Sequence, residues 1–164
     1  MSKLGELKEI LKKLIAIPSV TGNEHDIAIY IADYLRQCGV DSVELQPVEG
    51  NRLNVVAHLK GEKVGPVVLL TGHMDTVAPG EGWRTDPFKA TERDGRIYGR
   101  GAADMKGGIA AILVAIRNAA AQREQMRGEA IIAFVCDEEA YSKGVDALIR
   151  SGIRADYGIA AEPE

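Results

Sequence analysis

The stretch VVLLTGHMD, residues 67–75, decides how the rest of the chain is interpreted. Four large aliphatic residues follow Gly65 and Pro66 with no polar residue alternating between them. This pattern is typical of a strand buried on both faces. His73 and Asp75 then stand at the carboxyl end of that strand. Because open α/β sheets bind ligands beyond the carboxyl ends of their strands, the stretch predicts functional side chains there.

Composition narrows the class of protein. The chain has 164 residues, of which 46% are hydrophobic and 27% charged, with a formal net charge of -4. These values indicate one ordinary globular domain and disfavour a nucleic-acid partner. No apolar run approaches the roughly 20 residues of a membrane helix, and the N-terminus has no signal-peptide pattern, so we expect a cytoplasmic protein without a membrane partner. Cys38 and Cys136 are expected to be small buried apolar side chains, not a disulfide.

Two amphipathic helices are predicted before the strand at 67–70. Residues 3–17 place leucine and isoleucine at three- and four-residue steps, and Pro18 ends this pattern. The sequence TGNE, residues 21–24, has the form of a capping box with Thr21 as the N-cap of a second helix. Both helices are expected to serve as scaffold.

The remaining sequence alternates between strand and helix patterns. Short β-type segments at 42–45 and 53–59 precede the central strand. The apolar stretches 130–136 and 157–161 predict two further buried strands, and the apolar segment 109–122 predicts a buried helix whose preceding glycines allow close backbone approach. We therefore expect an α/β fold with a mixed, largely parallel sheet flanked by helices.

Acidic residues and one histidine recur where the predicted strands end. They are His73 with Asp75, then Asp104, then Glu138 with Glu139, and finally Glu162. Each alone has an ordinary explanation, such as a helix cap or a solvated edge, but their recurrence at one rim of the sheet favours a shared site. Adjacent carboxylates repel each other unless a cation holds them. One imidazole with several carboxylates suits zinc, cobalt or manganese, and the absence of a thiolate ligand argues against a structural zinc finger.

A site rich in carboxylates suits two divalent ions. One bridging carboxylate can hold two ions roughly 3.5 to 4 Å apart, and such a pair lowers the pKa of a shared water to about 7 and polarises a carbonyl.

Two other kinds of site, a dinucleotide site and a glycosidase site, fit this sequence poorly. The segment GRGAADMKGG, residues 99–108, lacks the third glycine of a dinucleotide fingerprint because Asp104 stands there. A glycosidase using Glu138 and Glu139 is disfavoured because adjacent residues cannot flank a bond across a cleft.

Four motifs together resemble a known family. They are GHMDTV at 72–77, GRGAADMKGG at 99–108, DEE at 137–139 and AEP at 161–163. In this order they are similar to the co-catalytic di-zinc deacylases and exopeptidases, which include acetylornithine deacetylase, succinyl-diaminopimelate desuccinylase, aminoacylase and glutamate carboxypeptidases. The resemblance extends over essentially the whole chain. It implies a hydrolase of N-acyl amino acids or small peptides, in which a metal-bound hydroxide attacks the amide carbonyl.

The resemblance implies a metal ligand for each of four positions. Asp104 corresponds to the bridging ligand, Glu139 to a terminal ligand of one metal, and His73 and Glu162 to terminal ligands of the other. The implied cofactor is two Zn²⁺ ions, with Co²⁺ or Mn²⁺ as alternatives.

The resemblance also implies two catalytic roles and one backbone feature. Glu138 corresponds to the general base, and Asp75 to the aspartate that orients the histidine ligand. The peptide bond between Asp104 and Met105 is expected to be cis.

The resemblance further predicts the domain organisation. Residues 1–164 correspond to the N-terminal segment of a metallohydrolase catalytic domain, whereas the family adds a lid or dimerisation domain and a C-terminal part with one more histidine ligand. Neither is in this sequence, so we expect weak metal binding and little turnover from these residues alone. The alternative is a non-catalytic metal-binding or interaction module that needs a partner chain or associates with itself.

Overall fold

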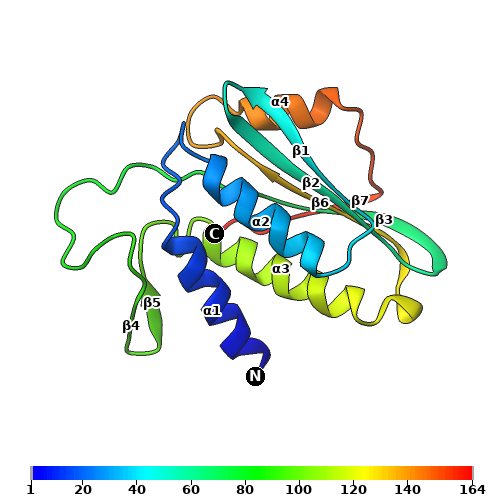
Figure 1. Ribbon diagram of the computed structural model, residues 1–164, viewed down its shortest axis with the longest axis horizontal. Coiled ribbons are helices and arrows are strands. Elements are labelled where there is room, and N and C mark those ends of the chain that lie inside the picture. Colours follow the sequence, from blue (N-terminus) through cyan, green and yellow to red (C-terminus); the bar gives the residue numbers. More distant parts are fainter. Residues whose placement is uncertain (1, 164) are drawn as a thin grey trace.

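A computed structural model describes residues 2–163 and places one sheet at the centre of the chain (Figure 1). The elements are, in chain order, α1 (Lys3–Ile15), α2 (His25–Gln37), β1 (Ser42–Glu49), β2 (Arg52–Lys60), β3 (Lys63–His73), β4 (Thr91–Arg93), β5 (Arg96–Tyr98), α3 (Lys106–Ala120), the 3₁₀ helix η1 (Arg123–Gln125), β6 (Arg127–Val135), α4 (Lys143–Arg150) and β7 (Tyr157–Ala160). The central sheet has the strand order β1-β2-β6-β3-β7, and β4 and β5 form a separate hairpin.

The strand directions confirm the predicted mixed, largely parallel sheet. β2 is antiparallel to both β1 and β6, whereas β3 is parallel to both β6 and β7. Only β2 therefore runs against the other four strands. The carboxyl ends of β3, β6 and β7 consequently lie at the same edge of the sheet, which is where the predicted site residues follow.

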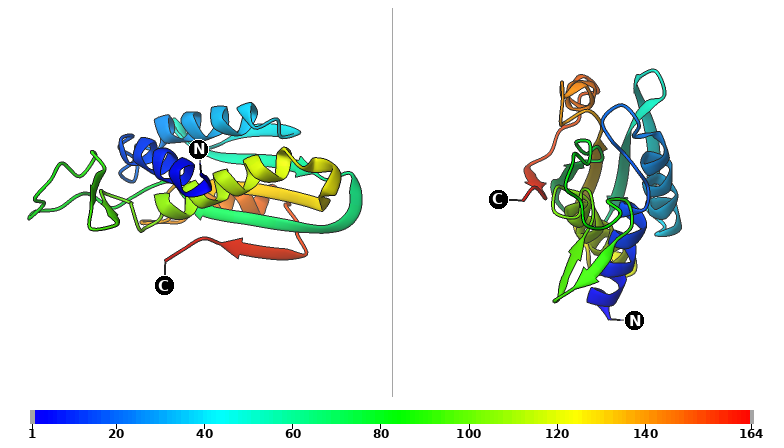
Figure 2. Two further views of the ribbon diagram at one scale, coloured as in Figure 1. Left: turned by 90° about the horizontal axis from the view of Figure 1, so that it is seen from below. Right: turned by 90° about the vertical axis from the view of Figure 1, so that its left-hand side faces the viewer.

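Helices cover the two faces of the sheet unequally. α1, α2 and α3 lie on one face, and α4 lies on the other (Figure 2). The larger core cluster joins the first three helices to the sheet through buried residues such as Ile31, Leu113 and Phe134. The smaller cluster packs Leu148 of α4 near Val56 and other residues of the opposite face. α3 contacts both α1 and β3, and its residues Ile109, Leu113 and Ile116 are buried, as expected for the helix predicted at 109–122.

Two predictions about burial are wrong. Residues 67–70 of β3 are half-buried, not buried on both faces, and the strand already begins at Lys63. All four residues of β7 are exposed, including Tyr157 and Ile159. The reason is that, within residues 2–163, no helix packs over β7 at this edge of the sheet as α2 packs over β1 and β2 and α3 over β3.

The predicted capping box is also wrong. The N-cap of α2 is Glu24, and no side chain caps the helix. The carboxylate of Glu24 instead accepts hydrogen bonds from the buried guanidinium of Arg52, and the Thr21 hydroxyl donates to the carboxylate of Asp75. A charged hydrogen bond to a buried guanidinium stabilises more than a neutral cap, so the tertiary contact prevails over the local one.

The cysteines are free, as expected. Cys136 is buried, as predicted. Cys38 is only half-buried, so the prediction of burial is wrong for that residue.

Among residues 2–163, no helix is long and apolar enough to span a lipid bilayer.

Candidate metal centre

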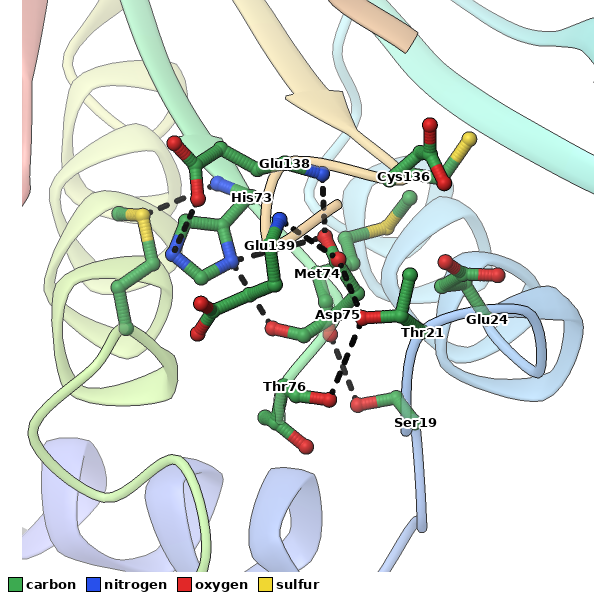
Figure 3. Close-up of polar contacts among 12 residues, drawn as sticks. Ser19, Thr21, Glu24, His73, Met74, Asp75, Thr76, Cys136, Glu138 and Glu139 are labelled. Carbon is green, nitrogen blue, oxygen red and sulfur yellow. Dashed lines mark hydrogen bonds and ion pairs between the residues drawn. The ribbon is translucent and has the colours of Figure 1, made fainter. Parts of the chain in front are cut away.

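His73 is the buried residue around which the candidate site is arranged. β3 ends at this residue, and the ring nitrogen Nδ1 lies 2.9 Å from the carbonyl oxygen of Asp75 (Figure 3). A carbonyl oxygen can only accept, so Nδ1 carries the proton of a neutral ring. The other nitrogen, Nε2, is then the one available to a metal, and it lies 3.0 Å from Oδ1 of Asp104.

The structure brings the other predicted ligands to the same nitrogen. Ligand atoms of His73, Asp104 and Glu139 all lie within 4.8 Å of one another. Carboxylate oxygens of Glu162 and Glu138 lie 3.6 Å and 3.9 Å from Nε2 of the histidine. These side chains follow β3, β6 and β7 or precede α3, so the shared edge of the parallel strands gathers them as expected.

The electrostatics of the cluster fit a divalent cation. Burial, followed by the negative charge of Asp104, raises the pKa of Glu139. Burial also raises the pKa of Glu162. Several carboxylates around one imidazole therefore repel one another in the absence of a cation, and an ion with nitrogen and oxygen ligands would relieve that repulsion. The donor set fits zinc, cobalt or manganese.

Asp75 occupies the predicted place but contacts more than the histidine. Its backbone carbonyl makes the close contact with His73, whereas its carboxylate Oδ1 lies 3.6 Å from Nδ1. The buried carboxylate accepts hydrogen bonds from the Thr21 hydroxyl and from the backbone N–H groups of Glu138 and Glu139, at 2.9 to 3.1 Å. Burial opposes ionisation, but His73 and these donors outweigh it and hold the pKa of Asp75 below its ordinary value. Asp75 therefore contacts both the histidine and the backbone of the acidic pair.

The segment between α1 and α2 supports the site in a way that the sequence did not reveal. The Ser19 hydroxyl donates to the carbonyl of Met74. The backbone N–H of Thr76 donates to the carbonyl of Ser19, and the carbonyl of Thr76 accepts from the backbone N–H of Thr21. The ammonium of Lys106, which is fully buried, donates to the carbonyl of Ile17 at 2.8 Å. Polar residues directly after the helix-ending Pro18 were the only local signal of this role. The long-range partners could not be identified from it.

Two glycines permit close packing near the ligands. A Cβ atom at Gly108 would lie 2.2 Å from the carbonyl oxygen of Ala161, and one at Gly72 would lie 2.1 Å from the methyl carbon of Met105. Gly108 lets the segment after β7 approach α3 and so brings Glu162 to the site, whereas Gly72 lets the side chain of Met105 pack against β3. The peptide bond between Asp104 and Met105 is cis, as the resemblance implied.

Trp83 stabilises the loop between β3 and β4. It is half-buried, its indole N–H donates to the carbonyl of Pro79, and the guanidinium of Arg100 lies 5.3 Å from the centre of its ring. These contacts fix the loop. A cavity of about 330 Å³ beside it is lined by residues 81–85 and by Thr91, Arg93 and Tyr98, not by the predicted site residues.

Comparison with known proteins defines the class. The sequence pattern of Peptidase family M20/M25/M40 matches residues 69–163, and the chain belongs to this family. Succinyl-diaminopimelate desuccinylase of Bordetella avium (strain 197N) is 38% identical over an alignment of 162 residues, which covers 94% of this chain and 42% of that protein. The desuccinylase of Nautilia profundicola is 36% identical over 160 residues, with 94% and 41% covered.

Solved structures show the same fold. Human carnosine dipeptidase 1 superposes with a TM-score of 0.82 at 25% identity, covering 95% of this chain and 38% of that one. An M20 family metallo-carboxypeptidase from Sulfolobus solfataricus gives a TM-score of 0.84 at 25% identity, with 95% and 37% covered. The chain thus spans less than half the length of the proteins that it resembles.

Proposed function

We propose that this chain carries a metal centre for the hydrolysis of amide bonds in N-acyl amino acids or small peptides. The observation that carries the proposal is the approach of ligand atoms from His73, Asp104 and Glu139 to within 4.8 Å of one another. Membership of the M20/M25/M40 family and the similarity to desuccinylases and a dipeptidase support it. We also propose that residues 1–164 form the N-terminal segment of a catalytic domain, which agrees with relatives more than twice as long.

In this proposal four side chains hold the metal. Asp104 would be shared by two divalent ions, Glu139 would hold one of them, and His73 and Glu162 would hold the other. Zinc is the proposed metal, with cobalt or manganese as alternatives. Such ions supply Lewis-acid polarisation of a carbonyl and lower the pKa of water.

Glu138 is the proposed proton carrier. Its carboxylate is half-exposed and lies 3.9 Å from Nε2 of His73, close to the cluster. The backbone N–H of Glu138 is fixed by Asp75, which sets the position of the side chain without using its carboxylate. Glu138 can therefore accept a proton from water and deliver it to the leaving amine.

The first experiment measures metal binding and hydrolysis on the same protein. The purified chain is titrated with Co²⁺ and then assayed with N-succinyl-diaminopimelate, N-acetylornithine and dipeptides. We expect weak Co²⁺ binding and low turnover, and we expect Glu138→Gln to retain the Co²⁺ spectrum while losing about 100-fold or more of any metal-dependent hydrolysis. Absence of Co²⁺ binding would overturn the proposed site, and turnover at ordinary enzyme rates would contradict the expected low activity.

A specific observation favours the alternative of an interaction module. Tyr157 and Ile159 lie on the edge strand β7 and are 66% and 54% exposed. An apolar edge strand with unpaired backbone groups promotes association. We expect light scattering after size exclusion to show self-association that Ile159→Lys reduces, whereas Ile149→Lys, at an exposed isoleucine of α4, leaves it unchanged. A wild-type chain that is monomeric throughout would contradict this alternative.

A further inference from the structure

The two adjacent glutamates of the candidate site follow a residue with unusual backbone geometry. Asp137 is buried and has a φ angle of +68°, in the left-handed region. This conformation is uncommon for a residue other than glycine and persists where surrounding contacts stabilise it. The contacts of Asp137 therefore determine the direction in which Glu138 and Glu139 leave the end of β6.

A buried guanidinium at the start of β2 provides one of these contacts. Nη2 of Arg52 lies 2.7 Å from Oδ1 of Asp137, and the same guanidinium donates two hydrogen bonds to the fully buried carboxylate of Glu24. The second carboxylate oxygen of Asp137 accepts from the backbone N–H of Lys143 at 3.1 Å. One cation thus links α2, β2 and the turn after β6.

The same strand holds both ends of the turn. Asn54 lies two residues after Arg52 and therefore on the same face of β2. Its amide oxygen accepts from the N–H of Cys136 at 3.1 Å, and its amide nitrogen donates to the carbonyl of Gly144 at 2.8 Å. A Cβ atom at Gly144 would lie 2.3 Å from the carbonyl oxygen of Cys136 and 2.6 Å from the amide oxygen of Asn54, so the two ends of the turn lie close to each other and to β2.

We propose that Arg52 is a positioning residue that directs Glu138 and Glu139 toward His73. The inference rests on the proposed function, because it concerns the placement of the general base and of one ligand. Asp75 holds the backbone N–H groups of both glutamates from one side. In the view of Figure 3, Glu24, the partner of Arg52, lies on the side of Asp75 away from the histidine. The backbone of the acidic pair is thus held by the carboxylate of Asp75, which accepts from its N–H groups, and by the guanidinium of Arg52, which binds the preceding residue, Asp137.

Charge accounts for the requirement for arginine at this position. Without the guanidinium, the carboxylates of Glu24 and Asp137 would be buried with no opposite charge between them, which is strongly unfavourable. The turn would then open toward water to solvate Asp137 and would release the two glutamates. Lysine at position 52 supplies the charge but cannot form the forked contact with Glu24 while reaching Asp137, so it restores the geometry only in part.

Amide hydrogen exchange in the metal-free chain tests this role. In Arg52→Met, we expect protection of the Glu138 and Glu139 amides to fall at least about tenfold more than that of Ile132 in β6, because only the turn opens. Arg52→Lys should recover part of the loss. Asp137→Asn, which keeps a side chain compatible with the left-handed backbone, should reproduce the selective loss even if Arg52→Met does not fold.

A matched control comes from another ion pair with a buried carboxylate. Arg117 of α3 pairs with Glu6 of α1 in the helical layer. Arg117→Met should lower protection across the chain without singling out the two glutamate amides. The proposal is overturned if, in Asp137→Asn and in Arg52→Lys, the Glu138 and Glu139 amides keep the wild-type protection relative to the Ile132 amide. It is also overturned if Arg117→Met produces the same selective loss. Because exchange is measured without metal, a chain that fails to bind Co²⁺ would disprove the proposed function and still decide the role of Arg52.

Discussion

Replacing Asp104 with alanine is expected to remove measurable binding of divalent metal while leaving the chain folded. Its carboxylate lies 3.0 Å from Nε2 of His73 and belongs to the group of ligand atoms within 4.8 Å. The side chain is 54% exposed, so its loss removes little packing. In the proposed site this carboxylate would serve both ions, so its removal should weaken the binding of each.

The measurement compares metal content and thermal stability of the same variants. Loss of a group that merely supports a ligand weakens metal binding about 10- to 100-fold, so loss of the bridging ligand should cost at least about 100-fold. His73→Ala should have a similar effect. Asp26→Ala, at a carboxylate with an 86% exposed side chain in α2, is the matched control and should bind metal as the wild type does. Equal metal content in all four proteins would disprove the site assignment.

The sequence was sufficient to predict the convergence of the site residues. His73, Glu138 and Glu162 each follow an apolar run, and such runs and their ends are local features that can be identified without tertiary information. Parallel strands then place these ends at one edge of the sheet, as β3, β6 and β7 do. The alternation of strand and helix patterns was enough to predict that arrangement.

Contacts between distant segments were beyond the same reasoning. The TGNE sequence satisfies the local pattern of a capping box, but Glu24 binds Arg52, which lies 28 residues further along the chain. The burial of residues 67–70 was overestimated because an apolar strand does not reveal which of its faces another element covers. Asp75 stands only two residues after His73 in the sequence, but its hydrogen bonds to the N–H groups of the acidic pair depend on the meeting of β3 and β6. Local patterns thus predict where a side chain emerges, and tertiary contacts determine what it binds.

Metal affinity is also expected to rise steeply with pH because of His73. Burial opposes protonation of this ring, but its contacts with Asp75 and Asp104 prevail and raise its pKa to about 9 in the metal-free chain. A metal binds only the neutral imidazole, so below this pH an ion held by His73 must displace a proton from the ring. Every unit by which the pH falls below the pKa then lowers the apparent affinity about tenfold, and the expected change between about pH 6 and pH 8 is roughly 100-fold.

The sign of this effect separates metal binding from folding. A raised pKa means that the protonated ring stabilises the metal-free fold below the unfolded value near 6.5, and that this contribution is lost as the pH rises through about 9. Metal affinity should therefore increase over the range in which the metal-free chain loses stability. Titration with Co²⁺ at several pH values, with thermal unfolding of the metal-free chain measured in parallel, records both trends. His25→Gln, at a half-exposed histidine of α2, should keep the slope of the wild type, and an affinity independent of pH over this range would contradict ligation by His73.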